Sequence, residues 1–276
     1  TPSPTRTPTK TPGATTSSPT RTPTSSPVSV SKPLISVSFT GNPSGTKYTE
    51  SMAKNDFNLS ATYLAGLNEG RGVLASDAGN PYLRVIYPQG CVGPKECGVQ
   101  LKFPLGATFS ELWVSFRVRF ETGFMWIKGG KLPGLCGGTC PTGCVAVDGL
   151  DGFSARHMWR ADGKAVGYTY EPLKTESCGE DYPFGTFVAG RWHKVTTRVR
   201  MNFGGEHAAN GVLQTFLDGA EVLRNETMLW RNSDSAFGIN TFYFSTFFGG
   251  SDNSWAPTKI SYIDFDDIVV SKTPLS

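Results

Sequence analysis

Short runs of alternating polar and apolar residues recur along most of the 276-residue chain, separated by clusters of Gly, Pro, Asn and Asp. The runs are rich in β-branched and aromatic side chains, and five show the two-residue period most clearly: 112–120, 194–200, 212–219, 241–248 and 260–270. A period of two places the apolar side chains on one face of a strand, and long helical patterns are nearly absent. We therefore expect an all-β fold, an antiparallel β-sandwich of jelly-roll type, in one domain over residues 34–276.

Residues 1–33 have a different composition and are almost only Thr, Ser and Pro. Nothing in this segment can bury apolar surface, so we expect a disordered linker of the kind that carries O-glycans on secreted proteins. A linker at this position also leads us to expect an upstream module, such as a carbohydrate-binding domain, in a longer protein.

The formal charge of +3 first suggests a nucleic acid as partner, but the excess is local. Residues 1–33 hold Arg6, Lys10, Arg21 and Lys32 and no acidic residue, so the remainder carries a charge of about −1. Nucleic-acid binding therefore loses its compositional support. No apolar stretch reaches the roughly 18 residues of a membrane-spanning helix, so we expect no membrane partner.

The six cysteines indicate disulfides: Cys91, Cys97, Cys136, Cys140, Cys144 and Cys178. Their even number, the linker and two glycosylation sequons, at Asn58 and Asn225, agree on a secreted protein. A metal site at the three central cysteines is the alternative, but their spacing matches no common zinc site, and we expect neither a metal nor a cofactor. Cys91 with Cys97 is the easiest local pair, which leaves Cys136, Cys140 or Cys144 to bond Cys178.

Three kinds of active site find little support. The chain has no Glu-x-Asp-x-x-Glu run of the kind that gives a jelly-roll glycosidase its two facing carboxylates. Asp148 and Asp151 lie in a Gly-rich segment, where turn formation explains them. There is also no Gly-x-Ser-x-Gly elbow, P-loop or dinucleotide fingerprint.

Residues 124–170 concentrate the polar and aromatic side chains that could do chemistry. If 153–160 is a strand, Ser154, Arg156, Met158 and Arg160 share one face and His157 lies on the other. A hairpin through Asp162 and Gly163 would bring Tyr168 and Tyr170 next to that basic face. The alternative is an ordinary solvated strand face with two exposed tyrosines.

Several motifs in this order resemble polysaccharide lyase family 14, which contains alginate and glucuronan lyases: residues 129–135 (GGKLPGL), Ser154-x-Arg156 with Met158, Trp159 and Arg160, Tyr168-x-Tyr170, and residues 247–250 (FFGG) followed by Trp255. The resemblance spans roughly residues 110–270. It implies a β-jelly-roll and metal-independent β-elimination on a polyuronate. It places the catalytic residues on Lys131, Ser154, Arg156, Tyr168 and Tyr170. Two features are not part of the family's pattern: the loop from Cys136 to Cys144, and His157 next to Arg156.

These residue types suit a lyase. The C5 proton of a uronate is acidic enough to remove only when its carboxylate is neutralised, and Arg156 and Lys131 could do this. Tyr168 or Tyr170 could serve as base, acid or both, but base catalysis would require a neighbouring cation to lower a pKa of about 10. Ser154 would orient the carboxylate or a tyrosine. Lys131 as the base is the alternative assignment.

A second group of residues could bind substrate without reacting: Arg117, Arg119, Lys128, His157, Tyr243, Ser245 and Trp255. Arg117 and Arg119 alternate with apolar residues and could line a groove or simply be solvated. For His157 we favour a packed, hydrogen-bonded histidine over a catalytic one.

The leading hypothesis is a secreted, monomeric polysaccharide lyase that acts on an acidic polysaccharide. The substrate would be a β-1,4-linked polyuronate, either glucuronan or mannuronate-rich alginate. Glucuronan is favoured because a Thr/Pro linker on a cysteine-bearing domain suits a fungal or similar saprotroph. The alternatives are a non-catalytic carbohydrate-binding module or lectin on the same fold, and a glycoside hydrolase.

Overall fold

The computed structural model describes residues 1–3, 32–233 and 237–275. The linker predicted for residues 1–33 therefore falls almost wholly outside the described residues. Within them, no helix is long and apolar enough to cross a membrane.

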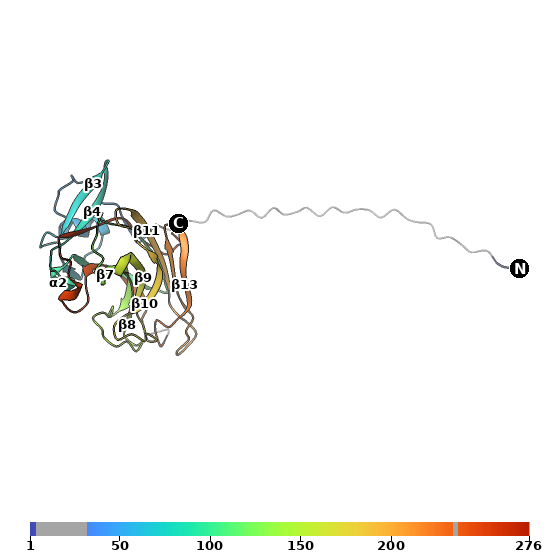
Figure 1. Cartoon of the computed structure of the whole chain (residues 1–276). Coiled ribbons are helices and arrows are strands. Elements are labelled where there is room, and N and C mark those ends of the chain that lie inside the picture. The colour runs from blue at the N-terminus through green and yellow to red at the C-terminus, as the bar shows by residue number, and fades with distance from the viewer. Residues whose placement is uncertain (4–31, 234–236, 276) are drawn as a thin grey trace. The chain divides into compact units, whose positions relative to one another are not determined.

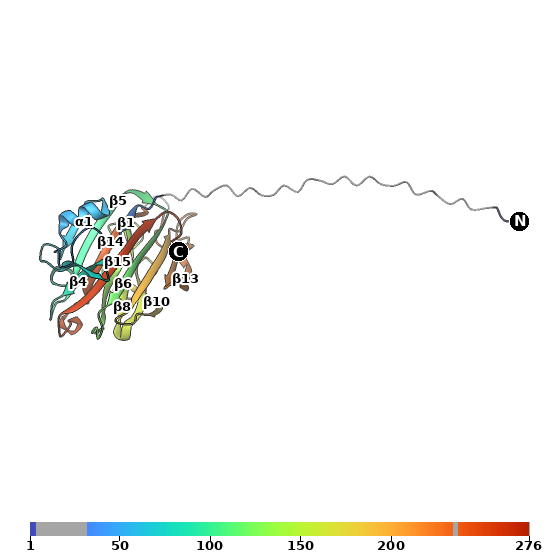
Figure 2. The ribbon, with the colours of Figure 1, turned by 90° about the horizontal axis from the view of Figure 1, so that it is seen from above.

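Two antiparallel sheets make up the domain, and neighbouring strands in each are hydrogen-bonded (Figures 1 and 2). The eight-stranded sheet has the order β13 (Ala220–Met228), β12 (Gly211–Leu217), β11 (Trp192–Arg200), β6 (Glu111–Phe120), β15 (Ser261–Ser271), β4 (Asn80–Tyr87) and β3 (Gly72–Asp77), with β1 (Ile35–Val37) paired to β15. The seven-stranded sheet has the order β10 (Glu180–Thr186), β9 (Lys164–Tyr170), β8 (Gly152–Arg160), β7 (Gly129–Gly138), β14 (Ile239–Phe248), β5 (Val99–Phe109) and β2 (Tyr63–Ala65). The short helices are α1 (Glu50–Phe57) and α2 (Gly93–Glu96), with 3₁₀ turns η1 (Ala161–Gly163) and η2 (Asn253–Trp255). The expected β-sandwich is confirmed.

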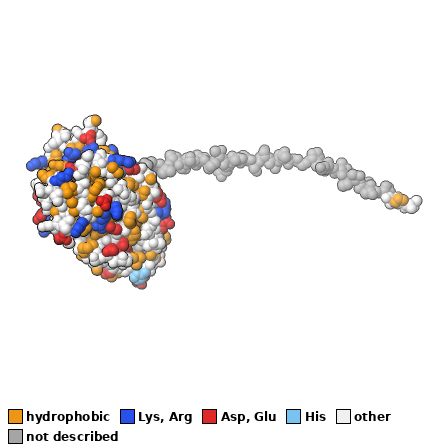
Figure 3. Space-filling view, in the orientation of Figure 1, with side chains coloured by type: hydrophobic (Ala, Val, Ile, Leu, Met, Phe, Trp, Pro, Cys, Tyr) orange, Lys and Arg blue, Asp and Glu red, His pale blue; other side chains and the backbone are white. Residues whose placement is uncertain are grey.

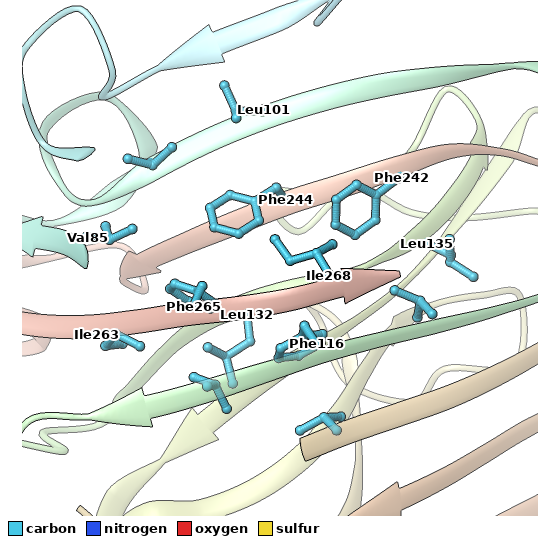
Figure 4. Close-up of a cluster of buried hydrophobic side chains, with 14 of the residues drawn as sticks. Val85, Leu101, Phe116, Leu132, Leu135, Phe242, Phe244, Ile263, Phe265 and Ile268 are labelled. Atoms are coloured by element: carbon cyan, nitrogen blue, oxygen red, sulfur yellow. The ribbon is translucent and has the colours of Figure 1, made fainter. Parts of the chain in front are cut away.

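The hydrophobic core lies between the two sheets. Phe116 and Phe265 from the eight-stranded sheet and Leu132 and Phe244 from the seven-stranded sheet are each at most 1% exposed and belong to one cluster (Figure 4). Burial of each such side chain contributes about 1.5–3 kcal/mol, so the alternating strand pattern is what holds the sheets together.

Strand β8 follows this alternation in detail and so sets the position of the polar residues. Ala155 and Trp159 belong to the inter-sheet core, whereas Arg156 and Met158 lie on the outer face of the seven-stranded sheet. The two faces are those expected from the sequence. The outer face of β8 is nevertheless buried, because loops cover it.

Three disulfides are present: Cys91–Cys97, Cys136–Cys140 and Cys144–Cys178. The local pair expected at Cys91 and Cys97 is found, and Cys178 bonds one of the three other cysteines, Cys144. The bond between Cys144 and Cys178 ties the loop that follows β7 to the loop that follows β9.

Candidate active site

A cavity of about 800 Å³ opens on the outer face of the seven-stranded sheet. Side chains from β7, β8, β9 and β14 form its floor, and the loops at 142–144, 176–181 and 249–255 form its walls. Six of the candidate site residues expected from the sequence line it: Lys131, Arg156, Tyr168, Tyr170, Tyr243 and Trp255. On the face shown in Figure 3, basic and acidic side chains are interspersed.

Arg156 lies at the floor of the cavity without an anionic partner. Its side chain is almost fully buried, at 2% exposure, and among the described residues no carboxylate lies within ion-pair distance of it. One guanidinium nitrogen donates to Ser245 Oγ at 3.4 Å, whereas Nε has no hydrogen-bond partner. Burial lowers the pKa of Arg156. A buried cation with unused donors is costly for the fold and well suited to bind a carboxylate.

Lys131 on β7 reaches the same cavity from the neighbouring strand. Its Nζ donates to Met158 Sδ at 2.9 Å and lies 4.1 Å from the centroid of the Tyr168 ring. Burial, followed by the positive charges of Arg156 and Arg160, holds the pKa of Lys131 well below its ordinary value. A lysine in this environment gives up its proton more readily than an exposed one, which suits it to act as a general base.

Tyr168 and Tyr170 lie side by side on β9, with ring centroids 5.7 Å apart. The backbone N–H of Gly179 donates to the Tyr168 hydroxyl at 2.9 Å, and that of Cys144 donates to the Tyr170 hydroxyl at 3.0 Å. Burial, followed by the side-chain hydrogen bond with Tyr170, raises the pKa of Tyr168 to about 12. The lowered pKa that base catalysis would require is therefore not found at Tyr168, which stays a neutral phenol able to donate a proton.

A second arginine of β8 also faces the cavity but is neutralised. Arg160 forms a two-point ion pair with Asp181, at 2.8 and 2.6 Å, and its guanidinium lies 5.4 Å from the centroid of the Tyr168 ring. Among the described residues, Arg156 and Lys131 are then the basic side chains of the cavity floor that have no carboxylate partner. The sequence placed Arg160 on the correct face but gave no indication of its partner.

Ser154 and Ser245 lie beneath the cavity and do not line it. Both are fully buried. The Ser154 hydroxyl donates to the Pro141 carbonyl at 2.8 Å, so it supports the cysteine loop, and Ser245 accepts from Arg156. In this geometry the Ser154 hydroxyl is used by the cysteine loop, and the role of Ser154 in orienting the carboxylate or a tyrosine stays a prediction.

Trp255 and Lys128 form part of the rim. Trp255 lines the cavity and its ring fills the space beside Gly250, where an added Cβ would lie 2.1 Å from the indole. Lys128 donates to Ser254 Oγ at 2.6 Å and lies 5.8 Å from the centroid of the Trp255 ring.

The structure overturns the placement of Arg117 and Arg119 in the substrate groove. Both lie on β6, in the eight-stranded sheet, and form ion pairs there: Arg117 with Asp267 at 3.6 Å and Arg119 with Asp264 at 2.7 Å. Each guanidinium also packs against the Trp192 ring. These contacts neutralise both arginines on the sheet that does not carry the cavity.

His157 is likewise not a substrate-binding residue. Its side chain points into the core, where Nδ1 is 2.6 Å from the Pro133 carbonyl and Nε2 is 2.8 Å from Thr197 Oγ1. Burial lowers its pKa to about 4, so it is neutral at physiological pH. The favoured interpretation, a packed and hydrogen-bonded histidine, is confirmed.

Two residues that the sequence did not single out complete the neighbourhood of Tyr243. The Tyr243 hydroxyl donates to Gln100 Oε1 at 2.5 Å. Lys102 Nζ lies 4.8 Å from the centroid of the same ring, and Arg156 Cζ lies 5.2 Å from it. Burial and the charge of Arg156 lower the pKa of Lys102. The register pairs Lys102 with Tyr243, but only the fold brings these strands together.

The carboxylates that line the cavity all come from one segment, residues 176–181. Asp181 is paired with Arg160, and Glu180 accepts from the backbone of Thr175 and Glu176. A glycosidase needs two carboxyl groups on opposite sides of the scissile bond, and this one-sided arrangement does not provide them. Among the described residues, no group of three or more His, Cys, Asp or Glu could hold a metal ion.

Comparison with known proteins agrees with this arrangement. The sequence profile of polysaccharide lyase 14 matches residues 75–268. Alginate lyase Aly36B is 25% identical with a TM-score of 0.75, and the alignment covers 88% of this chain and 98% of that one. An alginate lyase of Aplysia kurodai is 24% identical with a TM-score of 0.71, covering 88% and 100% of the two chains.

An endo-β-1,4-glucuronan lyase of Trichoderma reesei is more distant, at 15% identity and a TM-score of 0.54, covering 77% of this chain and 91% of that one. No curated protein matches the chain. The profile match extends over well more than half of the sequence and includes every residue of the cavity floor. The chain therefore belongs to the polysaccharide lyase 14 family and is a polysaccharide lyase.

Proposed function

We propose that this lyase cleaves a β-1,4-linked polyuronate by β-elimination in the cavity of the seven-stranded sheet. The observation that carries the proposal is the position of Arg156, a buried cation with no carboxylate partner among the described residues, beside a lysine and a tyrosine pair. The anion that this arrangement lacks is the carboxylate of a uronate.

Each step of the reaction has a residue suited to it. Arg156 binds the carboxylate attached to C5 and stabilises the negative charge that moves onto it. Lys131 Nζ, with its lowered pKa, removes the C5 proton. The electron pair of the C–H bond forms the C4=C5 double bond, and the C4–O4 bond breaks. Tyr168, a neutral phenol, donates its proton to O4, and the proton on Lys131 later restores the tyrosine through solvent.

Mannuronate-rich alginate is the substrate we place first. Alginate lyase Aly36B shares 25% of its residues with this chain, whereas the glucuronan lyase shares 15%. A variant of Aly36B in which a lysine and a methionine are replaced binds an alginate trisaccharide. Lys131 and Met158 are in contact here, and we propose that they correspond to that pair. This reverses the preference for glucuronan, which rested on the linker and not on the cavity.

We also propose that the protein acts outside the cell, since three disulfides persist in an oxidising compartment. The monomeric state and the upstream module stay predictions.

Incubation with polymannuronate and with polyglucuronate tests the function. We expect unsaturated chain ends that absorb in the ultraviolet, faster from polymannuronate, and a strong loss of rate in Tyr168→Phe. Binding of either polymer without product, unchanged in Tyr170→Phe, would instead indicate a lectin. Reducing ends released from neutral glucans would indicate a hydrolase.

A further inference from the structure

The disulfide between Cys144 and Cys178 lies at the wall of the cavity. Its two cysteines include or directly precede the backbone groups that contact Tyr170 and Tyr168. Cys144 is itself the donor to the Tyr170 hydroxyl. Gly179, the next residue after Cys178, is the donor to the Tyr168 hydroxyl. One covalent bond therefore joins the two loops that supply these donors.

The two loops have little regular structure that would hold the donors in place on their own. Cys144 follows the last residue of β7 by six positions and precedes β8, and Gly179 lies between β9 and β10. The cysteine loop around Cys144 contacts the sheet through Pro141, which accepts from Ser154. A cross-link that closes two such loops removes most of their freedom to move apart.

Gly179 shows how close this approach is. A Cβ placed on Gly179 would lie 2.6 Å from Tyr168 Cζ, a separation that real Cβ atoms do not reach. Only glycine lets the backbone come near enough for its N–H to reach the hydroxyl oxygen. The backbone of the loop at Gly179 is therefore in van der Waals contact with the ring of Tyr168.

In both hydrogen bonds the hydroxyl oxygen is the acceptor, so neither bond uses the proton of the phenol. The same N–H groups stabilise the negative charge that develops on the oxygen when that proton leaves. They act on a tyrosine in the way that an oxyanion hole acts on a tetrahedral intermediate.

We propose that the Cys144–Cys178 disulfide is a positioning element for catalysis: it holds the amides of Cys144 and Gly179 against Tyr170 and Tyr168, orients both phenols and stabilises the phenolate formed during proton transfer. This inference rests on the proposed β-elimination for its kinetic consequence. The contacts themselves do not depend on it.

The kinetic test uses Cys144→Ser/Cys178→Ser in the full chain, with unsaturated ends as the readout. Loss of a hydrogen bond to a developing charge predicts a fall in kcat of about 10- to 100-fold. KM for the polymer should change by less than about 3-fold, because Arg156 still binds the carboxylate. Gly179→Ala, which keeps the disulfide and displaces only the backbone, should reproduce the fall in kcat.

The control is Cys91→Ser/Cys97→Ser, which removes a disulfide whose residues donate no hydrogen bond to either tyrosine in the described part of the chain. Of the segment that this disulfide closes, Pro94 lines the cavity, at a distance in sequence from both tyrosine-contacting loops. It should keep the wild-type kcat for the fraction of protein that is folded, as measured by circular dichroism. Equal losses of kcat in this control and in Cys144→Ser/Cys178→Ser would overturn the proposal, and so would an unchanged kcat in both Cys144→Ser/Cys178→Ser and Gly179→Ala.

Amide hydrogen exchange by NMR separates this inference from the proposed function. In the wild type the amides of Cys144 and Gly179 should be protected, and Cys144→Ser/Cys178→Ser should speed exchange at positions 144 and 179 by about 10-fold or more. Tyr168→Phe should speed it at Gly179 alone. If these changes occur but no polyuronate is cleaved, the proposed function fails and the positioning contacts stand. If exchange is unaffected, the positioning role is refuted whatever the substrate.

Discussion

Replacement of Arg156 by methionine should make the protein more stable and nearly inactive. A buried, unpaired cation costs several kcal/mol of folding free energy. Methionine keeps most of the apolar volume and removes the charge. It cannot make the two cation–π interactions of the guanidinium, at 5.2 and 5.8 Å, or its hydrogen bond of 3.4 Å. These interactions contribute about 0.5–1 kcal/mol each.

The balance is a net gain of about 1–2 kcal/mol in the free energy of unfolding. For a domain of this size, that corresponds to an increase of about 2–8 °C in Tm. The rate of elimination should fall about 10²- to 10³-fold, as it does when one donor to a developing oxyanion is removed. Thermal unfolding and the ultraviolet absorbance of the products measure the two effects on the same preparation.

Arg198→Met is the matched control. Arg198 also packs against an aromatic ring, 5.8 Å from the Trp113 centroid, but it is paired with Glu111 at 2.8 Å and lies on the eight-stranded sheet. Its replacement should leave the activity intact and give no gain in stability. The reasoning would be refuted if Arg156→Met were less stable than the wild type by more than about 1 kcal/mol, or kept wild-type activity.

Three further predictions concern Lys131, His157 and Lys102. Lys131→Met should abolish elimination. It should also remove a pH dependence of stability. Between the lowered pKa of Lys131 and its ordinary value of 10.5, the folded wild type holds fewer protons than the unfolded chain, so the stability of the wild type rises with pH. In denaturant titrations, the stability advantage of the variant over the wild type should therefore shrink towards pH 10.5. His157→Gln should flatten the acid limb of stability, because the wild type loses up to about 3 kcal/mol as the pH falls from 6.5 to about 4; a limb unchanged in the variant would contradict this. Lys102→Gln should raise KM for long polyuronates about 3- to 10-fold and hardly affect KM for trisaccharides. The control is Lys272→Gln, which removes a lysine over the Phe109 ring and should leave KM unchanged. Equal effects of the two substitutions would show that Lys102 acts only through net charge.

The alternating pattern of residues 153–160 was enough to predict both the strand β8 and the division of its side chains between two faces. That is why His157 could be assigned to the core and Arg156 to the opposite face from the order of residues alone. A period of two reports only which residues share a face, however. It does not report which sheet a strand joins, so Arg117 and Arg119, with an equally regular pattern on β6, could not be separated from the cavity.

The raised pKa of Tyr168 could not be predicted from the sequence either. The raised pKa of Tyr168 comes mainly from burial, and the loops that bury it follow β7 and β9 with no strand pattern of their own. Lys102 escaped notice for a related reason, because it is separated from Tyr243 by more than 100 residues and meets it only through the pairing of β5 with β14. The order of the motifs, in contrast, can be read from the sequence without knowledge of the fold. The resemblance to polysaccharide lyase 14, which the family profile confirms, rested on that order.

The most direct test of the account is the mass of the chain ends that form when the wild-type protein degrades polymannuronate or polyglucuronate. β-Elimination adds no water, so each cleavage should produce one unsaturated uronate end that absorbs in the ultraviolet, and Arg156→Met should produce almost none. Products that have each gained a water molecule, without ultraviolet absorbance, would contradict the account.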